Sequence, residues 1–387
     1  MKKVIATEAK PIKMWLDDLE ETALAQAKNL ANLPFTFKHV ALMPDCHAGY
    51  GMPIGAVLAT KGVVIPNAVG VDIGCGMCAV KTSLPSIDKD SLSRIVDLIK
   101  EVIPVGFNHQ KEAQQIPPFA WNEAFPASVV LTEYDSARYQ LGTLGGGNHF
   151  IEVQRDHQGF IWIMIHSGSR NLGKKVADHY NKIAVGLNEL WYSKVEKSAE
   201  LAFLPINTIE GKAYLEEMKY CVEFALANRS FMMEKIKDCF RAVLPETTFF
   251  EAINIAHNYA AFENHFGENV IVHRKGATFA GLKTPGIIPG SQGTKSYITY
   301  GLGNPESFFS CSHGAGRRMG RKEAQRTLDL EAEKKLLDDQ GIIHGIKNVS
   351  DLDEAASAYK DINLVMENQK DLVTGIVELT PLAVIKG

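Results

Sequence analysis

The glycine-rich turn at residues 70–78 brings together two unlike side chains that can bind a metal ion. Asp72 and Cys75 lie three residues apart, and the surrounding glycines allow a tight turn in which a carboxylate and a thiolate reach one point. Hard oxygen beside soft sulfur is an unusual ligand pair, so this turn alone is equally consistent with a buried structural cysteine. Cys78 completes a C-x-x-C pattern, but no second such pair exists, which makes a structural zinc site a weak interpretation.

Three histidines stand beside small or polar residues rather than in apolar stripes. His149 follows a triple glycine, His166 ends an apolar run, and His257 precedes an asparagine. Each alone is as consistent with a structural role as with metal binding. Together with the carboxylate and thiolate of the turn at 70–78 they would supply five ligands. Five ligands are too many for one tetrahedral ion with an open position and suit two ions bridged by a thiolate.

Three further segments offer groups that bind anions. Arg170 follows a Ser/Gly-rich stretch after an apolar run, and the loop at 289–296 is rich in Gly, Ser and Thr, although it lacks the Walker A pattern. His313 is surrounded by small residues that would leave it exposed. A charged helix is expected to begin at Arg317, and its N-terminal amides would favour an anion beside His313.

Composition limits the classes of protein that this chain can belong to. Of its 387 residues 45% are hydrophobic, which excludes a disordered chain, and 41 basic against 45 acidic residues argue against non-specific coating of nucleic acid. No apolar run approaches the roughly 20 residues of a membrane helix, and the first residues do not resemble a signal peptide. Six cysteines in a chain of this length do not suggest a disulfide framework. We therefore expect a cytoplasmic protein without membrane contact.

Helical and strand patterns are mixed without regular alternation, which predicts an α+β fold with a mixed β-sheet core. We expect one domain over residues 1–387, with a helical subdomain at 174–244 that is interrupted near Pro205. Residues 104–126 should be irregular because prolines interrupt them. Other expected helices lie at 8–31, 86–102 with Ser86 as N-cap, 317–340, and after Ser350; expected strands include 150–153, 160–165, 270–273, 296–300 and 382–387.

Strand alternation assigns the residues around His149 to two faces. Asn148, Phe150 and Glu152 should share one face, and His149 and Ile151 the other.

The order of these motifs resembles the RtcB family of RNA ligases through nearly the whole chain. The segments that carry the resemblance are 43–47, Asp72 with Cys75, 148–152, 166–170, His257 with Asn258, 273–278, 289–296, 313–317 and 385–387. The resemblance implies the family's RtcB-like fold around a dinuclear metal site. It also implies GTP- and Mn²⁺-dependent joining of RNA 3′-phosphate or 2′,3′-cyclic-phosphate ends to 5′-hydroxyl ends, in tRNA splicing or RNA repair. An archease-type activator is a further partner that the family suggests.

The resemblance also implies roles for individual residues. His313 would become guanylylated, and Cys75 would bridge two Mn²⁺ ions, one held also by Asp72 and His149 and the other by His166 and His257. The guanylate contacts would be Asn148, Glu152, Asn258, Pro289, Gly290, Ser291, Gln292, Ser296, Gly314, Ala315, Gly316 and Lys386. Asp45, Arg170 and Arg317 are expected to contact substrate phosphates.

Two other functions remain compatible with the same residues. A two-metal phosphatase or cyclic phosphodiesterase would use water as nucleophile, and a non-catalytic protein would only bind RNA ends. Neither needs a guanylylated histidine, so His313 separates them from the ligase.

Overall fold

Two β-sheets form the centre of the computed structural model, which describes the backbone of residues 1–387 and all side chains but that of residue 376. The first sheet has the order β1 (Lys3–Ile5), β2 (Ile12–Met14), β3 (Thr36–His47), β4 (Ile54–Thr60), β12 (Glu268–Lys275) and β11 (Asn258–His265). The second has the order β10 (Ile253–Ala256), β6 (Gly76–Lys81), β8 (Ile161–Ser167), β7 (Phe150–Asp156), β17 (Val373–Lys386), β15 (Ser296–Gly301) and β14 (Pro285–Ile288). The pair β2–β3 is parallel and the other pairs in these sheets are antiparallel, so the core is mixed, as expected.

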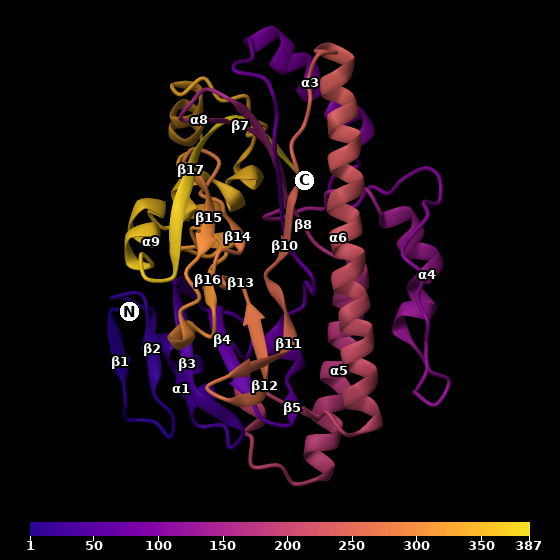
Figure 1. Cartoon of the computed structure of the whole chain (residues 1–387), viewed down its shortest axis with the longest axis vertical. Coiled ribbons are helices and arrows are strands. Elements are labelled where there is room, and N and C mark those ends of the chain that lie inside the picture. Colours follow the sequence, from indigo (N-terminus) through magenta and orange to yellow (C-terminus); the bar gives the residue numbers. More distant parts are fainter.

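Helices cover the outer face of the second sheet. The long helix α6 runs along the sheet, and α4 lies beyond it (Figure 1), while α5 packs against both α6 and α4. The helices are α1 (Glu21–Ala31), α2 (Pro66–Val69), α3 (Lys89–Val102), α4 (Val129–Gln140), α5 (Asn171–Leu190), α6 (Ile209–Val243), α7 (Arg321–Thr327), α8 (Leu330–Asp338) and α9 (Ile362–Asn368). Two short pairs complete the fold, β13 (Ala277–Phe279) with β16 (Ser310–Ser312) and β5 (Val63–Val64) with β9 (Leu204–Pro205).

The second sheet is apolar on both faces because each face meets another layer. In β6, Cys78 and Val80 face α3 and α6, where they pack in one cluster with residues such as Ile236. Met77 and Ala79 face the opposite side and pack with residues of β14, β15 and β17. Burial on both faces explains why strand β8 is an almost uninterrupted apolar run.

Several expected helices differ in extent from the observed ones. The helix expected at 8–31 begins only at Glu21, because Ile12 and Met14 pair with β3 instead. Asp88, not Ser86, caps α3 by accepting a hydrogen bond from Ser91 N. The helix expected at 317–340 is two helices, α7 and α8, because Asp329 caps a new helix.

Other expectations are confirmed, but several elements were missed, among them α2, β10 and β11. Residues 104–126 contain neither helix nor strand, and the helical block is interrupted at Pro205, which lies in β9. The expected strands all occur, and the last one begins earlier, at Val373. After Ser350 the chain forms short 3-10 turns and α9. Helix α4 was not expected. None of the described helices is both long and apolar enough to cross a membrane.

Candidate active site

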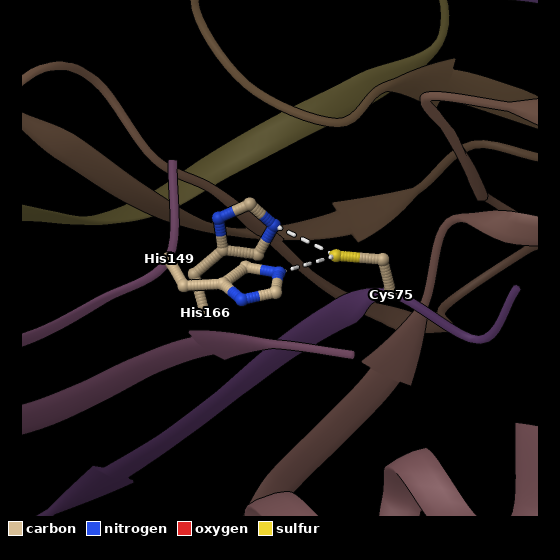
Figure 2. A group of neighbouring side chains, drawn as sticks. All are labelled: Cys75, His149 and His166. Atoms are coloured by element: carbon tan, nitrogen blue, oxygen red, sulfur yellow. Dashed lines mark hydrogen bonds between the residues drawn. The ribbon is translucent and has the colours of Figure 1, made fainter. Parts of the chain in front are cut away.

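Three neighbouring strands of the second sheet bring a thiol and two imidazoles to one end of the sheet. Cys75 immediately precedes β6, His149 immediately precedes β7, and His166 lies in β8 between these strands, opposite Met77 and Phe150. Cys75 Sγ lies 3.4 Å from His149 Nε2 and 3.3 Å from His166 Nε2 (Figure 2). All three are buried, and their ligand atoms are close enough together to hold one metal ion.

Asp72 and His257 extend this group on its two sides. Asp72 Oδ2 lies 3.1 Å from His149 Nε2, and His257 Nε2 lies 3.4 Å from His166 Nε2. His257 arrives there because it follows β10, in which Ala256 pairs with Gly76 of β6. The five side chains that the sequence analysis selected as metal ligands therefore meet in one place, although they span residues 72–257.

The chemistry of these side chains fits a metal ion. Burial lowers the pKa of His166 and of His257 well below the ordinary value, which keeps both imidazoles neutral and able to donate a lone pair. His166 Nδ1 lies 3.1 Å from the Asn148 carbonyl oxygen, which turns Nε2 toward the thiol. Burial raises the pKa of Cys75, so a nearby cation is needed to favour its thiolate.

His313 stands beside this cluster and is held from behind by the other sheet. Its ring centroid lies 4.7 Å from that of His257. Asp45, on β3, accepts hydrogen bonds from His313 N at 3.0 Å and from Nδ1 at 2.6 Å. This carboxylate leaves Nε2 as the ring nitrogen with a free lone pair, the arrangement of an activated nucleophile.

A cavity of about 630 Å³ opens in front of His313. Asn148, Phe150 and Glu152 line it together, which confirms the expected strand alternation. Of the other residues expected to contact a nucleotide, it is also lined by Pro289, Gly290, Ser291, Gln292, Gly314, Ala315, Gly316 and Lys386. The cavity is therefore lined by four segments that are distant in the sequence, and it lies next to the cluster of possible metal ligands.

Comparison with known proteins agrees with this arrangement. The family model described as tRNA-splicing ligase RtcB matches residues 26–120 and 118–387. The RNA-splicing ligase RtcB of Escherichia coli K12 is 39% identical over 100% of this chain and 99% of its own, and the tRNA-splicing ligase RtcB of Nanoarchaeum equitans is 32% identical over 97% and 95%. The RNA-splicing ligase RtcB of Mycobacterium tuberculosis is 32% identical over 94% and 100%.

The chain belongs to the RtcB family. The matches span nearly the whole chain, so the candidate metal ligands, His313 and the cavity all lie inside the shared region.

Two ionisable groups, Glu152 and Lys386, line the cavity of this RtcB-family chain. Burial raises the pKa of Glu152 to about 8, and Gln154 Nε2 donates a hydrogen bond to its Oε2 at 2.6 Å. Burial also lowers the pKa of Lys386, whose ammonium lies 5.8 Å from the Phe150 ring centroid. The cavity thus offers an acceptor and a donor group away from bulk water, where both interact strongly with a polar ligand.

Three expected ligand contacts have other partners in the structure. Asp45 is fully buried behind the His313 ring and does not line the cavity. Asn258 binds backbone, donating to Asp72 O and accepting from Gly276 N, so it shapes the metal-ligand turn. Ser296 Oγ is fully buried and accepts hydrogen bonds from Gln154 and from Gly290 N, which supports the loop at 289–296.

The two arginines expected to contact phosphates are partly engaged by protein groups. Arg317 lines the cavity, but its guanidinium binds Glu354 and the carbonyls of Met319 and Asp353. No helix begins at Arg317; α7 starts at Arg321, so its first amides are not adjacent to His313. Arg170 lies on the metal side, with Nη1 3.5 Å from His149 Nδ1.

Several cavity residues were not identified from the sequence. They are Glu20, His47, Tyr50, Arg321, Glu354 and Tyr359. His47 ends the segment 43–47, which carries part of the family resemblance. A glycine follows two residues later, so the sequence did offer a signal for this histidine. No motif near Glu354 marks it in the sequence. Its place at the cavity becomes clear only in the structure, where it forms ion pairs with Arg317 and Arg321.

Proposed function

We propose that this chain is an RNA ligase that joins 3′-phosphate or 2′,3′-cyclic-phosphate ends to 5′-hydroxyl ends through a guanylylated His313. The observation that carries the proposal is the placement of His313: Asp45 binds its Nδ1, His257 of the metal cluster lies against its ring, and a nucleotide-sized cavity opens before it. The names of the RtcB relatives support an activity on RNA.

In the proposed reaction the cavity holds GTP. Glu152 accepts hydrogen bonds from the N–H groups of guanine, Lys386 lies beside it, and the loop 289–292 with the turn 314–316 surrounds the nucleotide. His313 Nε2 attacks the α-phosphorus and pyrophosphate leaves, while Asp45 stabilises the positive charge that develops on the ring. A 2′,3′-cyclic phosphate is first opened by water to a 3′-phosphate and a 2′-hydroxyl. The guanylate then passes from His313 to the RNA 3′-phosphate, and the 5′-hydroxyl of the second strand attacks that phosphate and displaces GMP.

We propose two Mn²⁺ ions as cofactors. Cys75 would bridge them, with Asp72 and His149 on one side and His166 and His257 on the other. Bound there, the ions would neutralise phosphate charge and favour in-line attack. The thiolate by itself would favour zinc, so the choice of manganese rests on the resemblance to the family.

The remaining proposals concern the organisation and setting of the protein. We propose that residues 1–387 act as one catalytic domain with residues 174–244 as a helical subdomain, since the cavity draws on residues from 20 to 386. Asn258 and Ser296 would support the guanylate site through the contacts described above, and Arg170 and Arg317 would face RNA phosphates. A cytoplasmic location and an archease-type activator are proposed from the family alone.

Labelling with [α-³²P]GTP tests the nucleophile. Wild-type protein with Mn²⁺ should retain label on a denaturing gel, and His313→Ala should lose it. The exposed His157 provides a matched control, because His157→Ala changes a histidine in the turn after β7 and should label normally. Label retained by His313→Ala would refute the assignment of the nucleophile.

Ligation of defined RNA ends by the protein alone tests the overall reaction. Joining should require a 3′-phosphate or cyclic phosphate, a 5′-hydroxyl, GTP and Mn²⁺. Removal of the terminal phosphate without joining, and without label on the protein, would favour a two-metal phosphatase or cyclic phosphodiesterase. RNA binding with neither reaction would favour a non-catalytic RNA-end binder.

A further inference from the structure

The turn at 105–108 holds one aromatic side chain completely in solvent. Phe107 is 102% exposed, more than any other large hydrophobic residue described as exposed. The turn is ordered by two hydrogen bonds to Val105 O, from Asn108 N at 3.2 Å and Asn108 Nδ2 at 3.1 Å. A phenylalanine normally gains free energy by burial, so a built turn that displays one to solvent suggests a contact with something outside the chain.

This turn is connected directly to the metal cluster. Gly106 N donates to Gly145 O at 3.1 Å, and Gly106 O accepts from Arg170 Nη2 at 3.3 Å. The same guanidinium places Nη1 3.5 Å from His149 Nδ1. A Cβ at Gly145, where φ is +91°, would lie only 1.9 Å from Arg170 Nη1, so only glycine leaves room for this link. One side chain thus spans the space between the turn and a candidate metal ligand.

Positive charge lines the path from Phe107 to the cavity. Arg321 lines the cavity, is 51% exposed, and has Nη2 3.1 Å from the position of a Cβ on Gly147. Arg317 and Arg321 share the single carboxylate of Glu354, and the guanidinium of Arg321 stays half exposed at the cavity. An aromatic ring followed by cations and by the accessible glycine backbone of residues 146 and 147 has the chemistry that binds single-stranded nucleic acid, in which bases stack and phosphates pair with cations.

We propose that Phe107 stacks on an unpaired base of the RNA substrate, close to the end that is joined, and that the strand then crosses residues 146–147 past Arg321 toward the candidate metal ligands. This inference rests on the proposed function and adds a binding residue to it. Because every base has a flat face, the contact would strengthen RNA binding with little dependence on sequence.

The test compares Phe107→Ala and Phe107→Trp with wild type. Phe250→Ala is the matched control: Phe250 is also exposed, at 59%, but its backbone N donates a hydrogen bond to Lys81 O, at the end of β6 away from Cys75. With GTP and Mn²⁺ all variants should guanylylate His313 normally, which shows an intact site. Phe107→Ala should raise the KM for RNA about tenfold with kcat nearly unchanged, and Phe107→Trp should restore it.

Fluorescence supplies an independent readout. The emission added by Phe107→Trp, relative to the 4 native tryptophans of wild type, should be quenched by single-stranded RNA and less by blunt duplex. Normal guanylylation with an unchanged KM for RNA in Phe107→Ala would overturn the stacking proposal, and would leave a protein contact as the use of this surface. If wild type fails to guanylylate, the proposed function falls. In that case, quenching of the added Phe107→Trp emission by single-stranded RNA still supports the stacking proposal, and absence of this quenching overturns the proposal.

Discussion

Glu152 is a carboxyl group buried in the cavity wall, and burial raises its pKa from 4.5 to about 8. The folded protein therefore binds a proton at this residue that the unfolded chain releases above about pH 4.5. The resulting contribution to the free energy of unfolding is largest at low pH and is lost as the pH rises through about 8.

Glu152→Gln should remove this dependence. Relative to wild type, the variant should gain stability progressively as the pH rises from 6 to 9, measured by urea unfolding at each pH. Glu123→Gln, at an exposed position in the irregular segment, is the control. The same Glu152 substitution should weaken GTP-dependent labelling, because an amide presents an N–H group to the guanine donors. A constant stability difference across this pH range would contradict the assignment.

Cys75 and Cys78 are both buried near the same turn, but they face different surroundings. Cys75 Sγ lies among the histidines, whereas Cys78 packs in the apolar cluster with α3 and α6. Cys75→Ala should abolish tight Mn²⁺ binding, and Cys78→Ala should keep it while lowering the free energy of unfolding by about 1 kcal/mol. Metal analysis after gel filtration and urea titration measure both effects, and equal metal loss in the two variants would contradict the proposed ligand set.

At the scale of elements, helix α6 holds the strand ends that carry the candidate metal ligands. Arg229 is fully buried on α6, donating from Nη1 to Gly74 O and Ser167 O and from Nε to Asn254 Oδ1. Gly74 precedes Cys75 and Ser167 follows His166, so one guanidinium fixes the spacing of two candidate ligands. The apolar periodicity of α6 predicts its packing but gives no sign of this polar anchor.

Arg229→Met should therefore affect both stability and metal affinity. It leaves two buried carbonyls without a donor, so the free energy of unfolding should fall by about 2–4 kcal/mol. Arg241→Met on the same helix removes the exposed pair with Asp238 and the contact of the guanidinium with the Phe249 ring, and should cost less than about 1 kcal/mol. Urea titration and Mn²⁺ titration are the measurements; equal stability of the two variants would contradict an anchoring role.

At the scale of the whole molecule, the last strand of the chain contributes Lys386 to the cavity wall. Strand β17 pairs with β7 so that Lys386 lies opposite Phe150, and Gly387 packs against Gly145. Removing residues 386–387 should raise the GTP concentration for half-maximal labelling about tenfold, as expected for the loss of one charge-assisted contact. Lys386→Ala should give a similar effect with the full-length strand retained, and Lys370→Ala, in a surface ion pair, should give none. Unchanged labelling in the truncated protein would exclude this role.

The amino-acid sequence by itself determined the features that depend on neighbouring residues. It identified the glycine-flanked Asp, Cys and His residues, the shared face of Asn148, Phe150 and Glu152, and the interruption at Pro205, because spacing and alternation act within one segment. It misplaced the beginning of α1 and the helix expected at 317–340, where a β pairing and a cap overrode the local pattern.

Only the tertiary structure decided which partner each polar group has. Asp45 binds His313, and Glu354 binds Arg317 and Arg321, although the first pair lies 268 residues apart. A polar side chain forms its hydrogen bonds with whatever segment packs against it, and packing between distant segments is a property of the folded chain.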